Sequence, residues 1–225
     1  MLYQNMNSVT LYKDFNTNDV TFGQTLKNKA GGNQVYITSK NKHKIYLQTP
    51  SMYAPFGISE YNVEGSNMVK YSLDVSFKGY EEDSKINKFM DVVKEIDEYM
   101  IKTGVERSTE WFGKPMTDAV VRELYRPLWK ESRNPEKYAP TFKMKLRMSV
   151  NQNDFIVNAY HNHEEFKLDE LKPGSKIRSI IEFAPVWFVN KQFGVTPCLV
   201  QLDLVETPRN SLNGFSFEED DNFEC

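Results

Sequence analysis

The sequence predicts an α+β protein that is mainly β, a small β-barrel or sandwich carrying a helical insertion. Three observations support this prediction. Early segments alternate apolar and polar residues with the period of half-buried strands. The period then changes to that of an amphipathic helix, and strand-like segments return after it. With 225 residues, 40% of them hydrophobic, the chain is long enough to form one domain with a packed core.

The first strands are predicted between residues 33 and 77. Residues 33–40 and 43–49 flank the short polar link Asn41-Lys42, which indicates a hairpin. The clearest strand covers residues 68–77, where Val, Tyr, Leu, Val and Phe alternate with polar residues. Residues 1–30 are polar and weakly patterned, so no element is predicted there.

A helical insertion is predicted at about residues 81–130. Between 81 and 103 the apolar residues recur at spacings of three and four, which places them on one helical face. These residues are Ile86, Phe89, Met90, Val93, Ile96 and Met100. Gly104 is a plausible stop for this helix. A shorter helix is expected over 117–125, with Thr117 as its N-cap, before a polar loop at 131–140.

Strands are predicted again after residue 140. In residues 141–150 every second residue, from Phe142 to Val150, is apolar, and residues 154–160 form the next expected strand. Two long apolar runs follow at 176–190 and 194–206. Pro185 and Pro197 interrupt them, which indicates sheet edges or bulges.

Charge separates the body of the chain from its end. The formal net charge is −3, but five acids lie in the last eight residues, at Glu218, Glu219, Asp220, Asp221 and Glu224. Without them the chain has 28 basic and 26 acidic residues, a net charge of +2. We therefore expect one domain over residues 1–207 and a flexible, disordered acidic tail over 208–225.

The tail also carries aromatic residues, at Phe215, Phe217 and Phe223. A purely solubilising tail needs no aromatic side chains. An acidic segment with spaced phenylalanines can bind a basic partner that offers apolar pockets, or fold back on the protein's own cationic surface as a nucleic-acid mimic. The alternative is a solvating terminus.

Several classes of protein are not indicated. The two cysteines, Cys198 and Cys225, have no metal-like spacing, which is typical of a protein in a reducing, intracellular compartment. No signal peptide or membrane span is expected. No phosphate-binding loop, dinucleotide motif or nucleophile elbow occurs, so we expect no enzyme and no cofactor. His161 and His163 lack a third ligand at a suitable spacing, so we expect no metal site.

Cations and aromatic residues mark the candidate binding surface. Lys143, Lys145 and Arg147 face away from the apolar side of the predicted strand 141–150, about 7 Å apart. Phosphates of an extended single strand are comparably spaced, although a solvated strand face with protective lysines has the same pattern. A second cluster, Lys40, Lys42 and Lys44, runs into a segment that contains Tyr46 and Tyr53.

Bases stack on aromatic rings while cations hold phosphates, so Tyr46 and Tyr53 are candidate stacking residues. The alternative is that these two rings and Phe56 all pack in the core or in turns, and for Phe56 that is the better explanation. In an extended strand Trp187 and Phe188 face opposite sides, so one of them is a candidate stacker. We take Trp187, with Lys191 nearby, as part of the predicted nucleic-acid surface, and leave Trp111 open between core and stacking roles.

Five blocks of this sequence resemble single-stranded DNA-binding proteins of large nucleocytoplasmic DNA viruses. The blocks are Leu47-Gln48-Thr49-Pro50, Pro55-Phe56-Gly57, Trp111-Phe112-Gly113-Lys114, residues 138–147, and Trp187-Phe188 through Phe193-Gly194. The resemblance spans residues 33–206 and implies an OB-fold related to the single-strand binding proteins of short-tailed phages. Those end in acidic tails with an aromatic residue that recruit replication partners, whereas this chain ends in Cys225.

Pattern and resemblance together predict a sequence-tolerant single-stranded DNA-binding protein for viral DNA replication, recombination or repair. The resemblance implies a place in the host cytoplasm, at the viral factory, or in the nucleus. Expected partners are single-stranded DNA and, through the tail, replication proteins; the sequence does not decide between a monomer and a homo-oligomer. A viral structural or interaction protein and an RNA-binding module are the alternatives.

Overall fold

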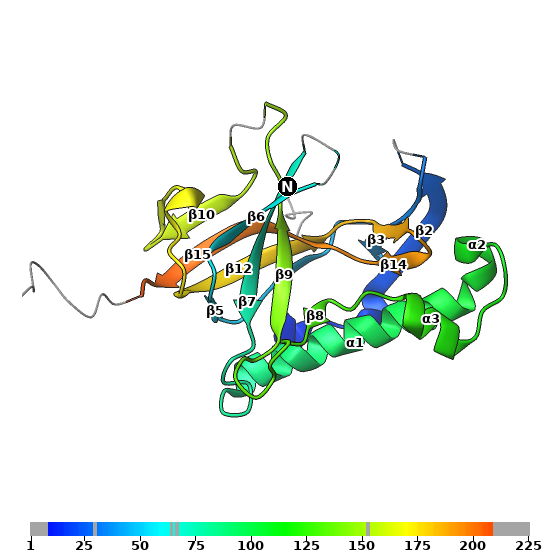
Figure 1. Cartoon of the computed structure of the whole chain (residues 1–225), viewed down its shortest axis with the longest axis horizontal. Helices are drawn as coiled ribbons and strands as arrows, with labels where there is room; N and C mark the ends of the chain where they lie inside the picture. Colours follow the sequence, from blue (N-terminus) through cyan, green and yellow to red (C-terminus); the bar gives the residue numbers. More distant parts are fainter. Residues whose placement is uncertain (1–8, 29–30, 64, 66–67, 152–153, 209–225) are drawn as a thin grey trace, which may run out of the picture.

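The computed structural model describes residues 9–28, 31–63, 65, 68–151 and 154–208, so the acidic tail lies outside the described residues. The described chain forms a large sheet that closes into a barrel, a second sheet of four strands, and three α-helices (Figure 1). This confirms the predicted fold class. The short elements at the start of the chain are β1 (Val9–Leu11) and two 3-10 helices, Tyr12–Asp14 and Thr17–Asp19.

Five strand positions close the barrel. In chain order they are β4 (Tyr46–Gln48) with β5 (Met52–Ala54), β7 (Val69–Ser76), β9 (Thr141–Leu146), β12 (Ser175–Phe183) and β15 (Pro197–Glu206). Numbered one to five, they pair in the cyclic order 1-2-3-5-4-1, with the third and fifth strands parallel. That closed order is the arrangement of an OB-fold barrel.

The strands β4 and β5 together occupy one strand position of the barrel, which is interrupted at Pro50. Both pair with β12, β4 through residues 180–182 and β5 through residues 175–177. Proline cannot donate a ladder hydrogen bond, so the pairing breaks there. Thr49 compensates, because its hydroxyl oxygen accepts a hydrogen bond from the Ser179 amide at 3.1 Å.

The second sheet has the order β14-β13-β3-β2 and extends from the barrel. It contains β2 (Val20–Lys27), β3 (Asn33–Ser39), β13 (Val186–Val189) and β14 (Gln192–Gly194). The predicted hairpin of residues 33–40 with 43–49 is wrong, because β3 and β4 do not pair with each other. The chain turns at Lys42, so that β3 belongs to the second sheet and β4 to the barrel. Strand β3 pairs with β13 on one side and with β2 on the other, and β2 lies in a region where the sequence pattern predicts no strand.

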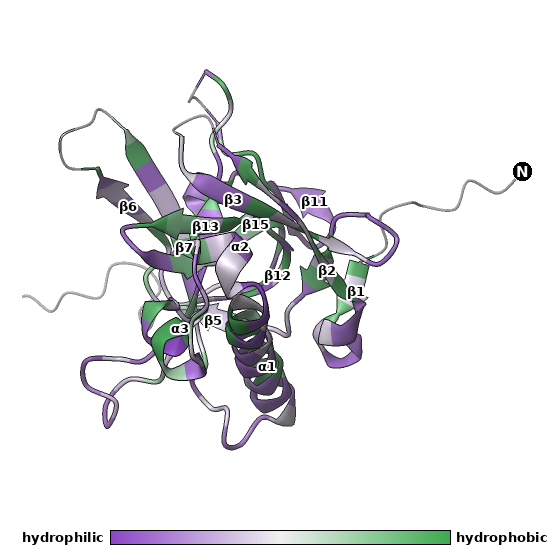
Figure 2. Ribbon diagram, turned by 90° about the vertical axis from the view of Figure 1, so that its right-hand side faces the viewer, coloured by the Kyte–Doolittle hydropathy of each residue, from purple (hydrophilic) through white to green (hydrophobic). Residues whose placement is uncertain are grey.

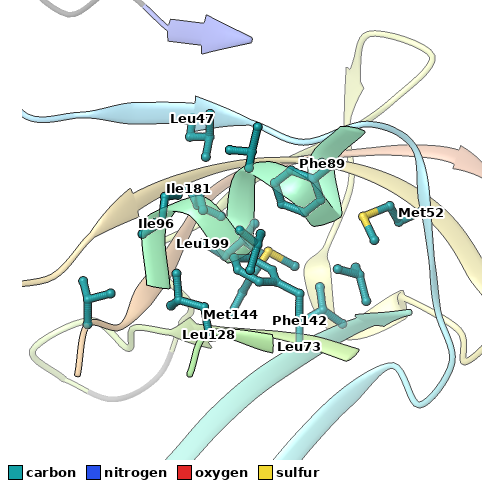
Figure 3. Close-up of a cluster of buried hydrophobic side chains, with 14 of the residues drawn as sticks. Leu47, Met52, Leu73, Phe89, Ile96, Leu128, Phe142, Met144, Ile181 and Leu199 are labelled. Carbon is teal, nitrogen blue, oxygen red and sulfur yellow. The ribbon is translucent and has the colours of Figure 1, made fainter. Parts of the chain in front are cut away.

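Helix α1 (Ser84–Glu106) runs beneath both sheets (Figures 1 and 2). The face predicted from its spacing is buried, and Phe89 enters the barrel core among Leu73, Phe142 and Met144 (Figure 3). The Phe89 ring lies 5.4 Å from that of Phe142 and 5.9 Å from that of Phe77, measured between centroids. The helix therefore closes one end of the barrel.

The far half of α1 packs under the second sheet and against α2 (Ser108–Phe112) and α3 (Asp118–Leu124). Gly104 lies inside α1 and does not end it, contrary to the sequence prediction. A Cβ atom at Gly104 would lie 2.9 Å from Val121 Cγ1 and 3.0 Å from Phe193 Cζ, so glycine is needed for close approach. Thr117 is at the N-cap position of α3, although its side chain makes no capping hydrogen bond.

A buried carboxylate fixes the chain after α3 to α1. Asp97 accepts hydrogen bonds from the Tyr125 hydroxyl at 2.6 Å and the Leu128 amide at 3.0 Å. Burial raises the pKa of Asp97 to about 6, and these hydrogen bonds only partly oppose the shift. Asp97 thus holds α3 and the following β8 (Trp129–Lys130) in place. Above about pH 6, where this carboxyl ionises, its burial lowers the stability of the fold.

The remaining strands extend the barrel sheet. They are β6 (Ile58–Asn62), β10 (Asn158–His161) and β11 (Glu164–Glu165), with a 3-10 helix at Leu168–Glu170. The strand predicted over 141–150 ends at Leu146, and Val150 is exposed rather than inward-facing. Of the helices in the described part, none has both the length and the hydrophobicity to cross a membrane.

Candidate nucleic-acid interface

The outward face of β9 carries Lys143 and Lys145. The inward residues Phe142, Met144 and Leu146 are buried, so alternation turns the lysines to solvent as predicted. Their states differ. Lys143 Nζ is 2.8 Å from an oxygen of Asp74, directly across on β7, whereas Lys145 has no carboxylate partner among the residues described.

Arg147 lies just beyond β9 and pairs with Glu182 of β12. The other oxygen of Glu182 is 3.0 Å from Lys44 Nζ. The structure therefore brings together two cationic segments that are about a hundred residues apart in the chain. Lys145 lies on the same surface, across β15 from Glu182. We refer to Lys44, Lys145 and Arg147 as the cation cluster.

Strand register explains why the cluster forms. Tyr46 of β4 is opposite Glu182 of β12, Glu182 is opposite Cys198 of β15, and Cys198 is opposite Lys145 of β9. Neighbouring strands are about 4.8 Å apart, so this row crosses four strands in about 15 Å. The cluster is a property of the closed barrel rather than of any one segment.

Glu182 stays ionised at the centre of the cluster. Burial pushes the pKa of Glu182 upward, but hydrogen bonds from Lys44 and the charge and hydrogen bond of Arg147 outweigh it and hold the pKa below its ordinary value. Beneath them, burial raises the pKa of the Cys198 thiol despite the charges of Arg147 and Lys145. Cys198 therefore packs as a neutral thiol under the cations.

Two of the predicted stacking residues lie on the strands beside β12, on the same side of it. Tyr46 is half-buried next to Glu182, so it adjoins the cation cluster. Tyr53 is opposite Lys176, about 20 Å further along β12, and the Lys176 ammonium lies 5.7 Å from the centre of its ring. Tyr53 thus belongs to a separate part of the same barrel surface.

Trp187 and Phe188 face opposite sides of the second sheet, as expected. Phe188 packs on Trp111, Phe112 and Phe193, whereas the Trp187 ring lies over Gly194 on the other face. We call that other face the outer face; by strand register it also carries Tyr36, which is 50% exposed. The open question about Trp111 is decided, since it is 2% exposed and belongs to the core.

The other predicted cations lie apart from the cluster. Lys40 pairs with Asp19 at 3.2 Å, and Lys42 occupies the turn after β3. Lys191 is in the tight turn between β13 and β14, where it and Asn190 have positive φ angles. The tail residues predicted to bind partners, Phe215 to Phe223, lie outside the described residues.

Three exposed residues near this surface were missed by sequence reasoning. Phe56 is 61% exposed in the turn before β6, so its expected packing role is wrong. Tyr61 of β6 is 62% exposed and lies opposite Lys70 of β7, on the face that also carries Lys145. Alternation within residues 68–77 could have placed Lys70 on this face, but nothing local marks Phe56 as exposed.

A shallow hollow of about 370 Å³ lies further along β12 and β15, lined by Arg178, Tyr160 and Gln201 among others. Arg178 is paired with Asp203, so this hollow offers no unpaired arginine. His161 Nδ1 donates a hydrogen bond to the Leu204 carbonyl oxygen at 2.8 Å. Within the described ranges, no three His, Cys, Asp or Glu side chains gather closely enough to hold a metal ion.

The fold and this surface define an OB-fold-like barrel protein with an outward cationic cluster and exposed aromatic residues. Residues 74–218 match the model of a family of unknown function, DUF5871, and the chain belongs to that family. None of the curated proteins matches the chain.

Solved structures of phage proteins are similar in shape. The single-stranded DNA-binding protein gp2.5 of bacteriophage T7 matches with a TM-score of 0.47 and 14% identity over 77% of this chain and 98% of its own. The single-stranded DNA-binding protein of bacteriophage Enc34, in complex with single-stranded DNA, matches with a TM-score of 0.46 and 12% identity over 84% and 97%. At these values the similarity does not decide what this chain binds.

Proposed function

We propose that this protein binds single-stranded DNA with little sequence preference and acts in viral DNA replication, recombination or repair. The observation that carries the proposal is the convergence of Lys44, Lys145 and Arg147 on the outside of the barrel. Cations that track a backbone while rings accept bases give binding that tolerates any sequence. We include in this proposal that the protein is related to the single-stranded DNA-binding proteins of large nucleocytoplasmic DNA viruses, which its sequence resembles.

The position of cations and aromatic residues on the barrel also supports the proposal. OB-folds bind oligonucleotides on the face of their second and third strands and with the connections between strands one and two and between four and five. Here the second and third strands carry Lys70 and Lys145. The first connection carries Phe56 and Tyr61, and the other is the β13–β14 hairpin with Trp187.

The chemistry of the cluster favours salt-sensitive binding. Glu182 neutralises part of the charge of Lys44 and Arg147, so phosphates compete with a built-in carboxylate. Lys145 offers an unpaired ammonium group, at least among the described residues. Exposed rings can stack on bases without reading hydrogen-bonding edges, each such contact contributing about 1–3 kcal/mol.

The test is a fluorescence-anisotropy titration of the full chain with labelled oligo-dT, a matched duplex and a matched RNA, at several salt concentrations. We expect tight binding to oligo-dT that weakens steeply with salt, and much weaker binding to duplex. Equal affinity for duplex and single strand contradicts the proposal. Stronger binding to RNA favours the RNA-binding alternative, and a stable assembly without any nucleic-acid binding favours the structural one.

We further propose that the acidic tail recruits replication proteins or competes with DNA for the cationic surface. Its sequence supports this, because Phe215, Phe217 and Phe223 are set among acids. A chain that lacks Phe215 to Cys225 should bind oligo-dT more tightly than the full chain, since a competing polyanion is removed. Unchanged or weaker binding contradicts competition and leaves recruitment, which a pull-down of replication proteins by the tail peptide tests.

A further inference from the structure

A second candidate site lies on the helix side of the four-stranded sheet. It is a cavity of about 550 Å³ between the β13–β14 hairpin, the end of α2 and α3. We call it the aromatic pocket. Phe112, Phe188, Val120 and Leu124 supply its apolar lining, and Lys27, Lys114 and Lys191 stand around it.

The apolar lining rests on a packed group of rings. The Phe112 ring is 5.8 Å from that of Phe188 and 5.2 Å from that of Phe193, and Phe188 stacks on Phe193 at 6.1 Å. Phe112 and Phe188 are only half-buried, and Val120 is 43% exposed. The pocket is therefore a preformed apolar hollow whose surface is open to a ligand.

The charge around the pocket has one sign. No aspartate or glutamate is among its lining residues, in a chain with a net charge of −3. Lys114 and Lys191 have no ion-pair partner in the part of the chain that the structure describes. Two positive φ angles, at Asn190 and Lys191, hold the hairpin turn that places Lys191 at the edge of the pocket.

We propose that the aromatic pocket binds a short acidic peptide of a partner protein through one aromatic anchor side chain. The anchor would fill the apolar hollow, and the flanking carboxylates would meet the three lysines. An aromatic side chain buries about 150–250 Å² and supplies most of the affinity of such a contact. The lysines select an acidic partner by charge complementarity.

This site goes beyond DNA binding and lies on the face of the second sheet opposite Trp187. Lys191, which the sequence predicted to join Trp187 in contacting nucleic acid, lines this pocket, and we assign it to the peptide. Phe188 lines the pocket, whereas Trp187, the next residue of β13, lies on the outer face of the sheet with Tyr36. The cation cluster lies on the barrel, on β9, β12 and the approach to β4. A partner peptide and single-stranded DNA should therefore bind the same molecule at the same time.

The test uses the full chain and a fluorescein-labelled peptide with one central phenylalanine between runs of aspartate and glutamate. We expect saturable binding in fluorescence anisotropy. Replacing the phenylalanine of the peptide with alanine should weaken binding at least about tenfold, because the anchor is lost. Val120→Asp and Lys114→Glu should each weaken it about tenfold, by placing a carboxylate in or beside the pocket.

Lys88→Glu is the matched control, because Lys88 is exposed on α1 and is not among the pocket residues. It changes the net charge as Lys114→Glu does, and it should leave peptide affinity unchanged. Saturating oligo-dT should not displace the peptide from the wild-type chain.

Three results would overturn the proposal. The first is equal weakening by Lys88→Glu and Lys114→Glu, which indicates non-specific attraction. The second is displacement of the peptide by oligo-dT, which makes the pocket part of the nucleic-acid surface. The third is tight binding only after Phe215, Phe217 and Phe223 are replaced with alanine, which makes the chain's own terminus the occupant. Failure to bind oligo-dT bears on the proposed function and not on this site.

Discussion

Two neighbouring positions on the barrel should change DNA affinity in opposite directions. Lys145 of β9 has no carboxylate partner within the described residues, and Lys143, two residues before it, is neutralised by Asp74 at 2.8 Å. Lys145→Ala removes a free cation, whereas Asp74→Asn releases one by removing the partner of Lys143. Both side chains lie on the outward face of the barrel, so neither change opens the core.

The magnitude follows from counterion release. Each phosphate neutralised on a single strand contributes about 0.7 to the slope of log affinity against log salt concentration. Losing one contact therefore lowers the slope by about 0.7 and the affinity about fivefold at 0.1 M salt. Asp74→Asn should raise the slope by about 0.7 and tighten binding by a similar factor.

The assay is anisotropy with labelled oligo-dT between about 0.05 and 0.2 M salt, a range over which a slope change of 0.7 alters the affinity ratio about 2.6-fold. Lys88→Ala, on α1 and away from the cluster, is the control and should leave the slope unchanged. An unchanged slope for Lys145→Ala, or weaker binding by Asp74→Asn, would refute the assignment of β7 and β9 to the DNA-binding surface.

Three further predictions use the same structure. Asp97 has a native pKa of about 6 against an ordinary 3.8, so its favourable contribution is complete below about pH 4 and is lost as pH rises through 6. Asp97→Asn keeps an acceptor for the Leu128 amide. In urea unfolding, the variant and the wild type should have similar free energies of unfolding near pH 4, and the variant should be more stable by about 2–3 kcal/mol at pH 7.5. Equal stability at pH 7.5 contradicts the raised pKa. Glu182→Gln leaves Lys44 and Arg147 without their carboxylate and should tighten oligo-dT binding several-fold, which weaker binding by a folded variant would contradict. Tyr61→Ala should weaken oligo-dT binding by about 1–3 kcal/mol without changing the melting temperature, because the ring is exposed.

Much of the fold could be predicted because its signals are local. The alternation over residues 68–77 and the start of 141–150 gave β7 and β9, and the spacing from Ile86 to Met100 gave the buried face of α1. These patterns depend only on which side of one element meets the core. Prediction failed where the structural partner is distant in the chain. Strand β2 was not predicted, and Gly104 was expected to end α1, whereas its missing side chain leaves room for Phe193.

The candidate site was only half visible in the sequence. The outward direction of Lys143 and Lys145 followed from alternation, but their different partners did not. Asp74 neutralises one of them from another strand. Phe56 was expected to pack and is exposed, since a turn residue carries no periodic signal. Whether the predicted residues contact DNA stays a prediction for the titrations above.

The sequence by itself determined the strand and helix faces of this protein, the excess of cations in its body and the acidic, phenylalanine-bearing end. Only the tertiary structure decided which cations meet. Lys44 and Arg147 share Glu182 because closure of the barrel places β4, β12, β15 and β9 side by side. Register across strands far apart in the chain depends on the packing of the whole core, and no local pattern of residues records it.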